Sequence, residues 1–181
     1  MKKTEKKIKR LYLIGQVNSE MSKEAIMELL ETTWETEKFE ELQVIVNSEG
    51  GFITDCFAII DIIELLRTTH NFKVVTIGTG MIASAGFFLF LMGESRWLSS
   101  NCRIFVHEHI TVEENEKTYS ERLRSDKTDQ KDTYEIYLNY TMKRLKILRR
   151  KAKVLLKKNK WLTSREINTF KIITGDKHDD K

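Results

Sequence analysis

The nineteen residues from 74 to 92 carry no charged side chain, and this segment constrains the fold more than any other. Its length is close to what a membrane-spanning helix needs. Its first part, V-V-T-I-G, is rich in β-branched residues, and its middle contains Gly78, Gly80 and Gly86. This pattern favours a buried strand, a tight turn and a buried helix over a membrane span. We therefore predict that the segment lies in the core of a folded domain.

The apolar segments around this core predict alternating strands and helices. The N-x-x-G-G run at 47–51 is a turn signal and is expected to end the second strand, and Ser22 is expected to cap the first helix. Expected helices run from Ser22 toward Trp34, over 52–67, and from the Ser84 turn through 92. Expected strands cover 11–17, 42–46, 73–78, 96–98 and 103–106. This order predicts an α/β fold of parallel strands joined by right-handed crossovers.

Residues 111–158 form a long polar stretch that contains neither Gly nor Pro. Residues 111–158 predict a long amphipathic helix with a shorter one after it, and a turn at 159–163 leads into a short helix near 164–170. A helix of this length has more apolar surface than one compact domain can cover. We therefore expect it to pack on another subunit of an oligomer.

Composition favours one domain without a metal or cofactor. The chain has 181 residues, of which 40% are hydrophobic, and a net charge of +4. We divide it into a basic N-terminal segment (1–10), a single domain (11–174) and a charged tail (175–181). Cys56 and Cys102 have neither disulfide nor zinc spacing, which favours a reducing compartment. With no secretory signal visible, cytoplasm is the default, and an organelle or a virus-encoded origin stays open.

Basic residues gather in two runs, at 1–10 and at 143–160. The second run has ten basic residues and no acidic one. Runs of this kind can bind nucleic acid or an anionic membrane, but they are more often a solvated tail or the wet face of a helix. We expect neither a specific nucleic acid nor a membrane as a partner.

Three short motifs contain residue types that carry hydrolytic chemistry. Ser84 lies among small residues between a strand and an apolar helix, as in a nucleophile elbow, although a plain helix N-cap gives the same pattern. The pair Gly50-Gly51 can direct backbone N–H groups at an oxyanion, or it can be an ordinary turn. His107 ends a buried strand, where it can be a general base or a structural histidine.

Taken in order, these motifs resemble the Clp peptidase family. That family has a strand ending N-S-P-G-G, a G-x-A-A-S-x-G turn and an R-x-x-x-P-N-x-R-I-x-x-H strand. The present chain reads N-S-E-G-G from Asn47, G-M-I-A-S-A-G from Gly80 and R-W-L-S-S-N-C-R-I-F-V-H from Arg96. A fourth match, N-K-W-L-T-S from Asn159, lies where the family places a catalytic aspartate. The resemblance covers roughly residues 11–174.

The resemblance implies a fold, a reaction and partners. The fold would be a crotonase-like spiral of βαβ units with a long protruding oligomerisation helix, within 118–157. Ser84 would be the nucleophile, His107 the base and Asn159 the third member, with Gly51 and Ala85 donating the oxyanion-hole N–H groups. Seven-membered rings, built from one or more kinds of subunit and stacked in pairs, would receive unfolded protein from an AAA+ Clp ATPase.

Two departures from the family pattern keep alternatives open. Asn159 replaces the aspartate, and an amide can orient an imidazole but cannot neutralise its positive form. Glu49 replaces a proline and adds negative charge beside the oxyanion glycines. The leading interpretation is an ATP-dependent serine endopeptidase subunit. A catalytically weak or inactive ring subunit is the alternative, and an acyl-CoA enzyme of the wider crotonase fold is a third.

Overall fold

The computed structural model describes residues 6–34, 39–107 and 127–174. Six strands form one sheet in the order β1-β2-β3-β5-β6, with β4 paired to β3. The strands are β1 (Ile8–Val17), β2 (Glu41–Gly51), β3 (Lys73–Ala83), β4 (Ser95–Leu98), β5 (Arg103–Val106) and β6 (Lys160–Trp161). The helices are α1 (Ser19–Trp34), α2 (Ile53–His70), α3 (Ala85–Leu91), α5 (Lys127–Leu145), α6 (Arg149–Leu156) and α7 (Ser164–Thr169).

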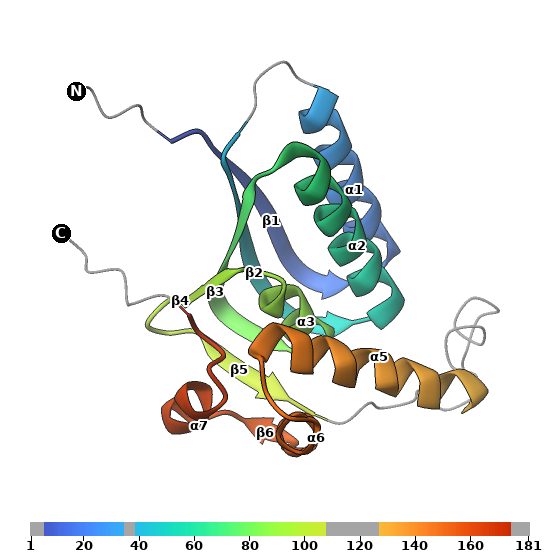
Figure 1. The fold of residues 1–181 in the computed structure, drawn as a ribbon, viewed down its shortest axis with the longest axis vertical. Coiled ribbons are helices and arrows are strands. Elements are labelled where there is room, and N and C mark those ends of the chain that lie inside the picture. The colour runs from blue at the N-terminus through green and yellow to red at the C-terminus, as the bar shows by residue number, and fades with distance from the viewer. Residues whose placement is uncertain (1–5, 35–38, 108–126, 175–181) are drawn as a thin grey trace.

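The sheet is parallel except at one edge, which confirms the predicted α/β class. β1, β2 and β3 pair in parallel, and β3 then pairs in parallel with β4 through its first half and with β5 through its last three residues. Only β5 and β6 pair antiparallel among the described residues. Figure 1 shows α1 and α2 side by side along the sheet, with α3 and α5 beneath them. The uncharged segment 74–92 thus supplies most of β3, the serine turn and α3 in the predicted order, but β3 continues to Ala83, beyond its expected end at Gly78.

The second strand is longer than the turn signal suggested. Residues 47–51 continue β2 up to Gly51, so the expected strand end at Val46 is wrong. The pairing register of this stretch shifts against both neighbouring strands. Against β1 the shift falls between Ile14 and Gln16 of β1, and against β3 it falls between Val46 and Ser48 of β2. Such irregularities bend a strand while keeping it in the sheet, and glycines allow the bend. One face of β2 is fully buried, while Gln43 and Ile45 on the other face are half-buried.

The first helix begins earlier than predicted because Asn18, not Ser22, is its cap. The Asn18 side-chain oxygen accepts a hydrogen bond from the backbone N–H of Met21 at 2.9 Å. Ser22 already lies inside α1, where its own N–H donates to the Asn18 carbonyl. Asparagine and serine cap helices about equally well, so sequence alone could not choose between them.

The helical C-terminal half packs back onto α3. Phe57 of α2 and Phe88 of α3 form an aromatic cluster with Tyr137 and Tyr140 of α5, with ring centroids 5.2–6.4 Å apart. Arg144 donates hydrogen bonds to the carbonyls of Leu91 and Met92, at the end of α3. Helix α5 ends at Leu145, and the backbone of Lys146 is left-handed, with a φ of 52°, before α6 begins. The long helix and the shorter one expected within 111–158 correspond to α5 and α6. The oligomerisation helix expected within 118–157 is thus interrupted after Leu145, and residues 108–126 lie outside the described residues.

Candidate active site

Ser84 occupies a strained turn between β3 and α3. Its φ of 52° and ψ of −124° lie in a region that non-glycine residues rarely adopt. Its side chain makes no capping hydrogen bond, although it holds the N-cap position of α3. Ser84 therefore holds the N-cap position that the sequence also allowed, but without the side-chain hydrogen bond that a capping serine makes. Strained backbones of this kind cluster at functional sites, and this one leaves the half-buried Ser84 hydroxyl outside the helix cap.

The glycine pair of β2 packs directly behind this serine. A Cβ added to Gly50 would overlap Ser84 Cβ and would lie 2.8 Å from the Ala83 carbonyl oxygen. Gly51 follows with a φ of 146°, and a Cβ there would overlap the Val17 carbonyl. The structure therefore requires glycine at both positions. Gly51, the predicted oxyanion-hole residue, is thus the chain neighbour of Gly50, which approaches Ser84.

Asn47 and Ser48, to which the sequence analysis gave no role, fix the geometry of these glycines. The Asn47 side-chain oxygen accepts a hydrogen bond from the backbone N–H of Met81 at 3.0 Å, so it ties β2 to the approach of the serine turn. The fully buried Ser48 accepts a hydrogen bond from the Gly50 N–H at 3.0 Å through its hydroxyl. Their place beside Gly50 in the N-S-E-G-G motif was the available signal, because Asn and Ser commonly bond to nearby backbone.

Ala85, the second predicted oxyanion-hole residue, begins α3. The first N–H groups of a helix have no acceptor within the helix, so this backbone is a natural donor site. The buried Cys56 of α2 donates from its thiol to the Ala85 carbonyl at 3.3 Å. Burial raises the pKa of this thiol far above its usual range. Cys56 therefore supports the serine turn from below as a neutral group.

His107 follows β5, the strand next to the serine turn. Ala83 pairs with Phe105, and the Ser84 N–H donates to the Phe105 carbonyl at 3.4 Å. His107 lies two residues further on, half-buried, with its ring centroid 5.8 Å from that of Phe105. The pairing of β3 with β5 thus brings Ser84 and His107 to the same end of the sheet. His109 and Glu108 lie outside the described residues.

Asn159 reaches the same end of the sheet through β6. Phe105 pairs with Trp161 and Val106 with Lys160, and the Leu162 N–H donates to the Ile104 carbonyl at 2.8 Å. Asn159 directly precedes this paired stretch of β6 and His107 directly follows that of β5, so both residues adjoin the same end of the β5–β6 pair. Asn159 is exposed and has a left-handed backbone, with a φ of 51°. Ser84, His107 and Asn159 are therefore gathered around one short strand.

Of two carboxylates near this site, that of Glu166 is already bound by other groups, and that of Glu49 is exposed to solvent. The Glu166 carboxylate accepts hydrogen bonds from Thr163 and from the ammonium groups of Lys158 and Lys160. The Lys158 ammonium, the Thr163 N–H and the Lys160 ammonium hold the pKa of Glu166 far below its usual range. Glu49 is exposed on β2, beside Gly50.

The model of the Clp protease family matches residues 3–175. The chain belongs to the Clp protease family. This membership agrees with the earlier resemblance and with the observed fold.

Curated Clp relatives match this family member over part of their length. It is 32% identical over 100 residues to ATP-dependent Clp protease proteolytic subunit 2 of Bifidobacterium longum, covering 54% of this chain and 46% of that protein. It is 28% identical over 104 residues to subunit 3 of Rhizobium etli, covering 56% and 50%. The matches thus span about half the length of these relatives.

A solved Clp structure has the same fold across nearly the whole chain. An asparagine-to-aspartate mutant of ClpP1 from Listeria monocytogenes superimposes with a TM-score of 0.73 at 19% identity, covering 91% of this chain and 88% of that one. At this identity the likeness establishes the fold of the Clp subunit alone.

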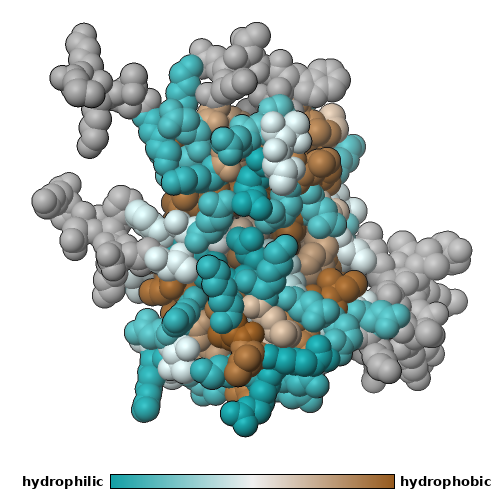
Figure 2. Space-filling model, viewed as in Figure 1, coloured by the Kyte–Doolittle hydropathy of each residue, from teal (hydrophilic) through white to brown (hydrophobic). Residues whose placement is uncertain are grey.

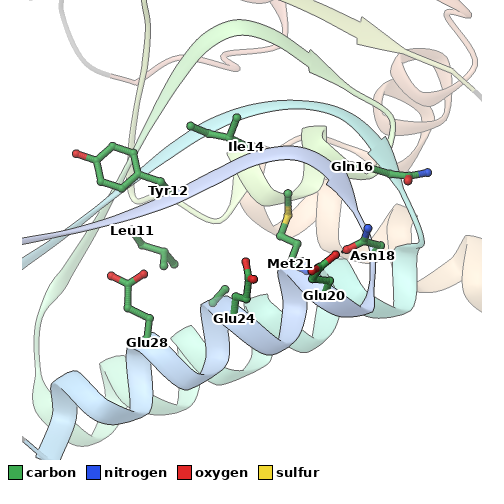
Figure 3. A pocket seen from close by; sticks show the side chains of 10 residues that line it. Leu11, Tyr12, Ile14, Gln16, Asn18, Glu20, Met21, Glu24 and Glu28 are labelled. Atoms are coloured by element: carbon green, nitrogen blue, oxygen red, sulfur yellow. The ribbon is translucent and has the colours of Figure 1, made fainter.

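Other candidate sites in this Clp subunit do not involve these residues. A groove of about 320 Å³ lies between β1 and α1, lined by side chains that include Tyr12, Ile14, Glu24 and Glu28 (Figure 3). It contains none of the predicted site residues.

Within the described ranges, His, Cys, Asp and Glu side chains nowhere form a group of three that could hold a metal ion. None of the described helices is both long and apolar enough to cross a membrane.

Proposed function

We propose that this Clp-family subunit is a serine endopeptidase with Ser84 as its nucleophile. One observation carries the proposal. Ser84 has a strained backbone, makes no capping bond with its side chain, and touches the strand that leads to His107. A structural serine would gain nothing from such strain, whereas a nucleophile must project from its turn toward a base.

The geometry supports acyl transfer in two steps. Ser84 Oγ attacks the scissile carbonyl while His107 takes the hydroxyl proton. The N–H groups of Gly51 and Ala85 stabilise the negative oxygen of the tetrahedral intermediate, each lowering the barrier by roughly 3 kcal/mol. His107 then delivers its proton to the leaving amine. Water, activated by the same imidazole, releases the acyl group from Ser84.

Asn159 is the proposed third member, and it makes the reaction slower than an aspartate would. Its side-chain oxygen can accept a hydrogen bond from the imidazole and so orient the ring. It carries no charge to stabilise the imidazolium that forms during attack. In a serine triad of another protein this exchange costs about 10⁴ in rate. We therefore expect a weak peptidase.

Assembly and partners are proposed from the relatives. The matched proteins are named proteolytic subunits of ATP-dependent Clp proteases, so we propose that this chain also works with a Clp ATPase on unfolded protein. Stacked seven-membered rings, of one or two kinds of subunit, would provide the chamber, and cytoplasm is the proposed location. α5 projects from the sheet in Figure 1 and has an exposed Ile136, which fits a role in contacts between subunits.

The second candidate function is a ring subunit without its own activity. Two residues favour it. Asn159 removes the negative charge that would stabilise the imidazolium, and the exposed Glu49 adds negative charge beside the glycines proposed to hold an oxyanion. Such a chain would keep the fold and assemble with an active subunit. The strain at Ser84 would then be a remnant.

Labelling with a fluorophosphonate probe distinguishes the two functions. The purified protein is first sized by light scattering, and the assembled fraction is then treated with the probe beside a Ser84→Ala variant. Covalent labelling at Ser84, located by peptide mass spectrometry and absent from the variant, is the expected result. An assembled wild-type protein that stays unlabelled would contradict the peptidase proposal and favour the second candidate.

A further inference from the structure

Glu166 holds the segment around Asn159 through both oxygens of its carboxylate. Oε2 accepts from the Thr163 N–H at 3.0 Å and from the Thr163 hydroxyl at 3.1 Å. Oε1 accepts from the ammonium groups of Lys158 at 2.7 Å and Lys160 at 3.0 Å. These two lysines are the residues immediately before and after Asn159. One carboxylate therefore ties both neighbours of Asn159 to the first turn of α7.

The two oxygens serve separate purposes. The bonds of Oε2, with the Thr163 hydroxyl accepting from the Glu166 N–H at 3.3 Å, form the capping box of α7. A capping box needs nothing from Oε1, so the contacts with Lys158 and Lys160 go beyond helix capping. The Glu166 side chain is 15% exposed, which screens these ion pairs less than at an open surface.

The segment that receives this support is short and strained. β6 has two residues, Lys160 and Trp161, and Asn159 lies one residue before it with a left-handed backbone. Trp161, the second residue of β6, packs on Phe105 of β5 with ring centroids 5.2 Å apart. The Arg103 guanidinium carbon lies 4.6 Å from the centroid of the Trp161 ring. Trp161 fixes how β6 lies on β5, and Glu166 acts on the backbone next to Asn159.

We propose that Glu166 is a positioning residue of the active site, which orients Asn159 toward His107 through its contacts with Lys158 and Lys160. This inference rests on the proposed function. Glu166 does not touch the reacting atoms, and it acts on the reaction by keeping the third member of the triad opposite the imidazole. A misplacement of about 1 Å at such a position can cost on the order of 100-fold in rate.

The substitution Glu166→Gln separates this role from helix capping. Glutamine also completes a capping box, so α7 keeps its cap, while a neutral amide no longer attracts the two lysines. The matched control is Glu135→Gln, which removes a surface ion pair with Arg149 at 2.6 Å, between α5 and α6. Both variants replace one ion-paired carboxylate by a neutral amide, with two lysine partners for Glu166 and one arginine partner for Glu135, and only the first contacts the neighbours of Asn159.

Two readouts test the proposal. The first is the second-order rate constant of fluorophosphonate labelling of the assembled protein, measured across pH 5–9. The second is the tautomer ratio of His107, from long-range ¹H–¹⁵N spectra of histidine-labelled protein with a His107→Gln variant for assignment. We expect Glu166→Gln to lower the labelling rate about tenfold and to change the His107 tautomer ratio, while Glu135→Gln changes neither.

The outcomes keep this proposal apart from the proposed function. An assembled Glu166→Gln protein with wild-type labelling rate, pH profile and His107 spectrum would overturn the positioning role and leave the peptidase proposal standing. Equal losses in Glu166→Gln and Glu135→Gln would also overturn it, because the effect would then be general destabilisation. If wild-type protein is not labelled at all, the peptidase proposal fails. A His107 spectrum that changes in Glu166→Gln alone would still support the positioning role.

Discussion

Gly50 and Ser84 are packed so closely that the space between them cannot hold one more carbon atom. A Cβ at position 50 would overlap Ser84 Cβ and come within 3.0 Å of the Ala85 backbone nitrogen. The substitution Gly50→Ala should therefore move the serine turn and one proposed oxyanion donor together. We expect labelling of Ser84 to fall at least about 100-fold, as when an oxyanion donor is lost.

Gly15→Ala is the matched control for this substitution. Gly15 has a φ of 95°, close to the 98° of Gly50, but a Cβ there would meet no atom within 4 Å. Both variants bear a left-handed strain of about 1–2 kcal/mol. A labelling rate that falls equally in both variants would show that strain, and not the contact with Ser84, is responsible.

Asn159→Asp should raise the peptidase activity. An aspartate opposite His107 would stabilise the imidazolium, and we expect the labelling rate to rise by about 10- to 10⁴-fold. The control is Asn139→Asp, the same exchange on an exposed position of α5. Peptide hydrolysis and labelling that stay at the wild-type level in Asn159→Asp would show that residue 159 is not the third member of the triad.

Acid should release the clamp formed by Glu166. Its pKa is held below the ordinary value of about 4.5 by Lys158, Thr163 and Lys160, so the ionised form is favoured in the folded state. A group with a lowered folded pKa contributes stability above its unfolded pKa and loses it as the pH falls toward the folded pKa. The melting temperature of wild type should therefore exceed that of Glu166→Gln by a constant amount above pH 5. The difference should shrink below about pH 4.5.

Calorimetric scans between pH 7 and 3 measure this difference directly. Glu135→Gln serves again as the control, because it removes an ion pair with Arg149 between α5 and α6. A gap between wild type and Glu166→Gln that keeps its size down to pH 3 would contradict the assigned ionisation.

Both cysteines should react slowly with thiol reagents in the folded protein. Burial raises the pKa of Cys102 to about 11, and it raises that of Cys56 still further. Only roughly one Cys102 thiol in a thousand would be ionised at pH 8, and the thiolate is the reactive form. Ellman's reagent should titrate both thiols at once in guanidinium chloride and very slowly without it. One equivalent of fast reaction in native protein would contradict this expectation.

The sequence predicted the centre of the fold better than its edges. The uncharged segment 74–92 gave β3, the Ser84 turn and α3, because an apolar run with glycines has few other ways to be buried. The end of β2 was predicted wrongly, since residues 47–51 look like a turn and instead continue the strand through a bulge. That outcome depends on Asn47 holding Met81 from another strand, a contact that no local pattern reveals.

The candidate site was predictable in its residue types and not in its geometry. Ser84, Gly51 and His107 were chosen from motifs, and the structure puts Ser84 against Gly50 of β2 and against Phe105 of β5, the strand that precedes His107. The placement of Asn159 depends on how a two-residue strand pairs with β5 across more than fifty residues of chain. The role of Glu166 was invisible for the same reason. Its capping box can be read from T-S-R-E, but its bonds to Lys158 and Lys160 follow from the bend of the backbone between them.

The mixed pairing of β5 divides the site into two parts that can change independently. The parallel neighbour β3 leads to the nucleophile, and the antiparallel neighbour β6 follows the third member, so the two meet only across the strand that ends at His107. A substitution on the β6 side can weaken the base while the serine turn keeps its shape. If the proposed site is active, one substitution on the β6 side can therefore lower its rate without unfolding the serine turn, and one substitution there can raise it again.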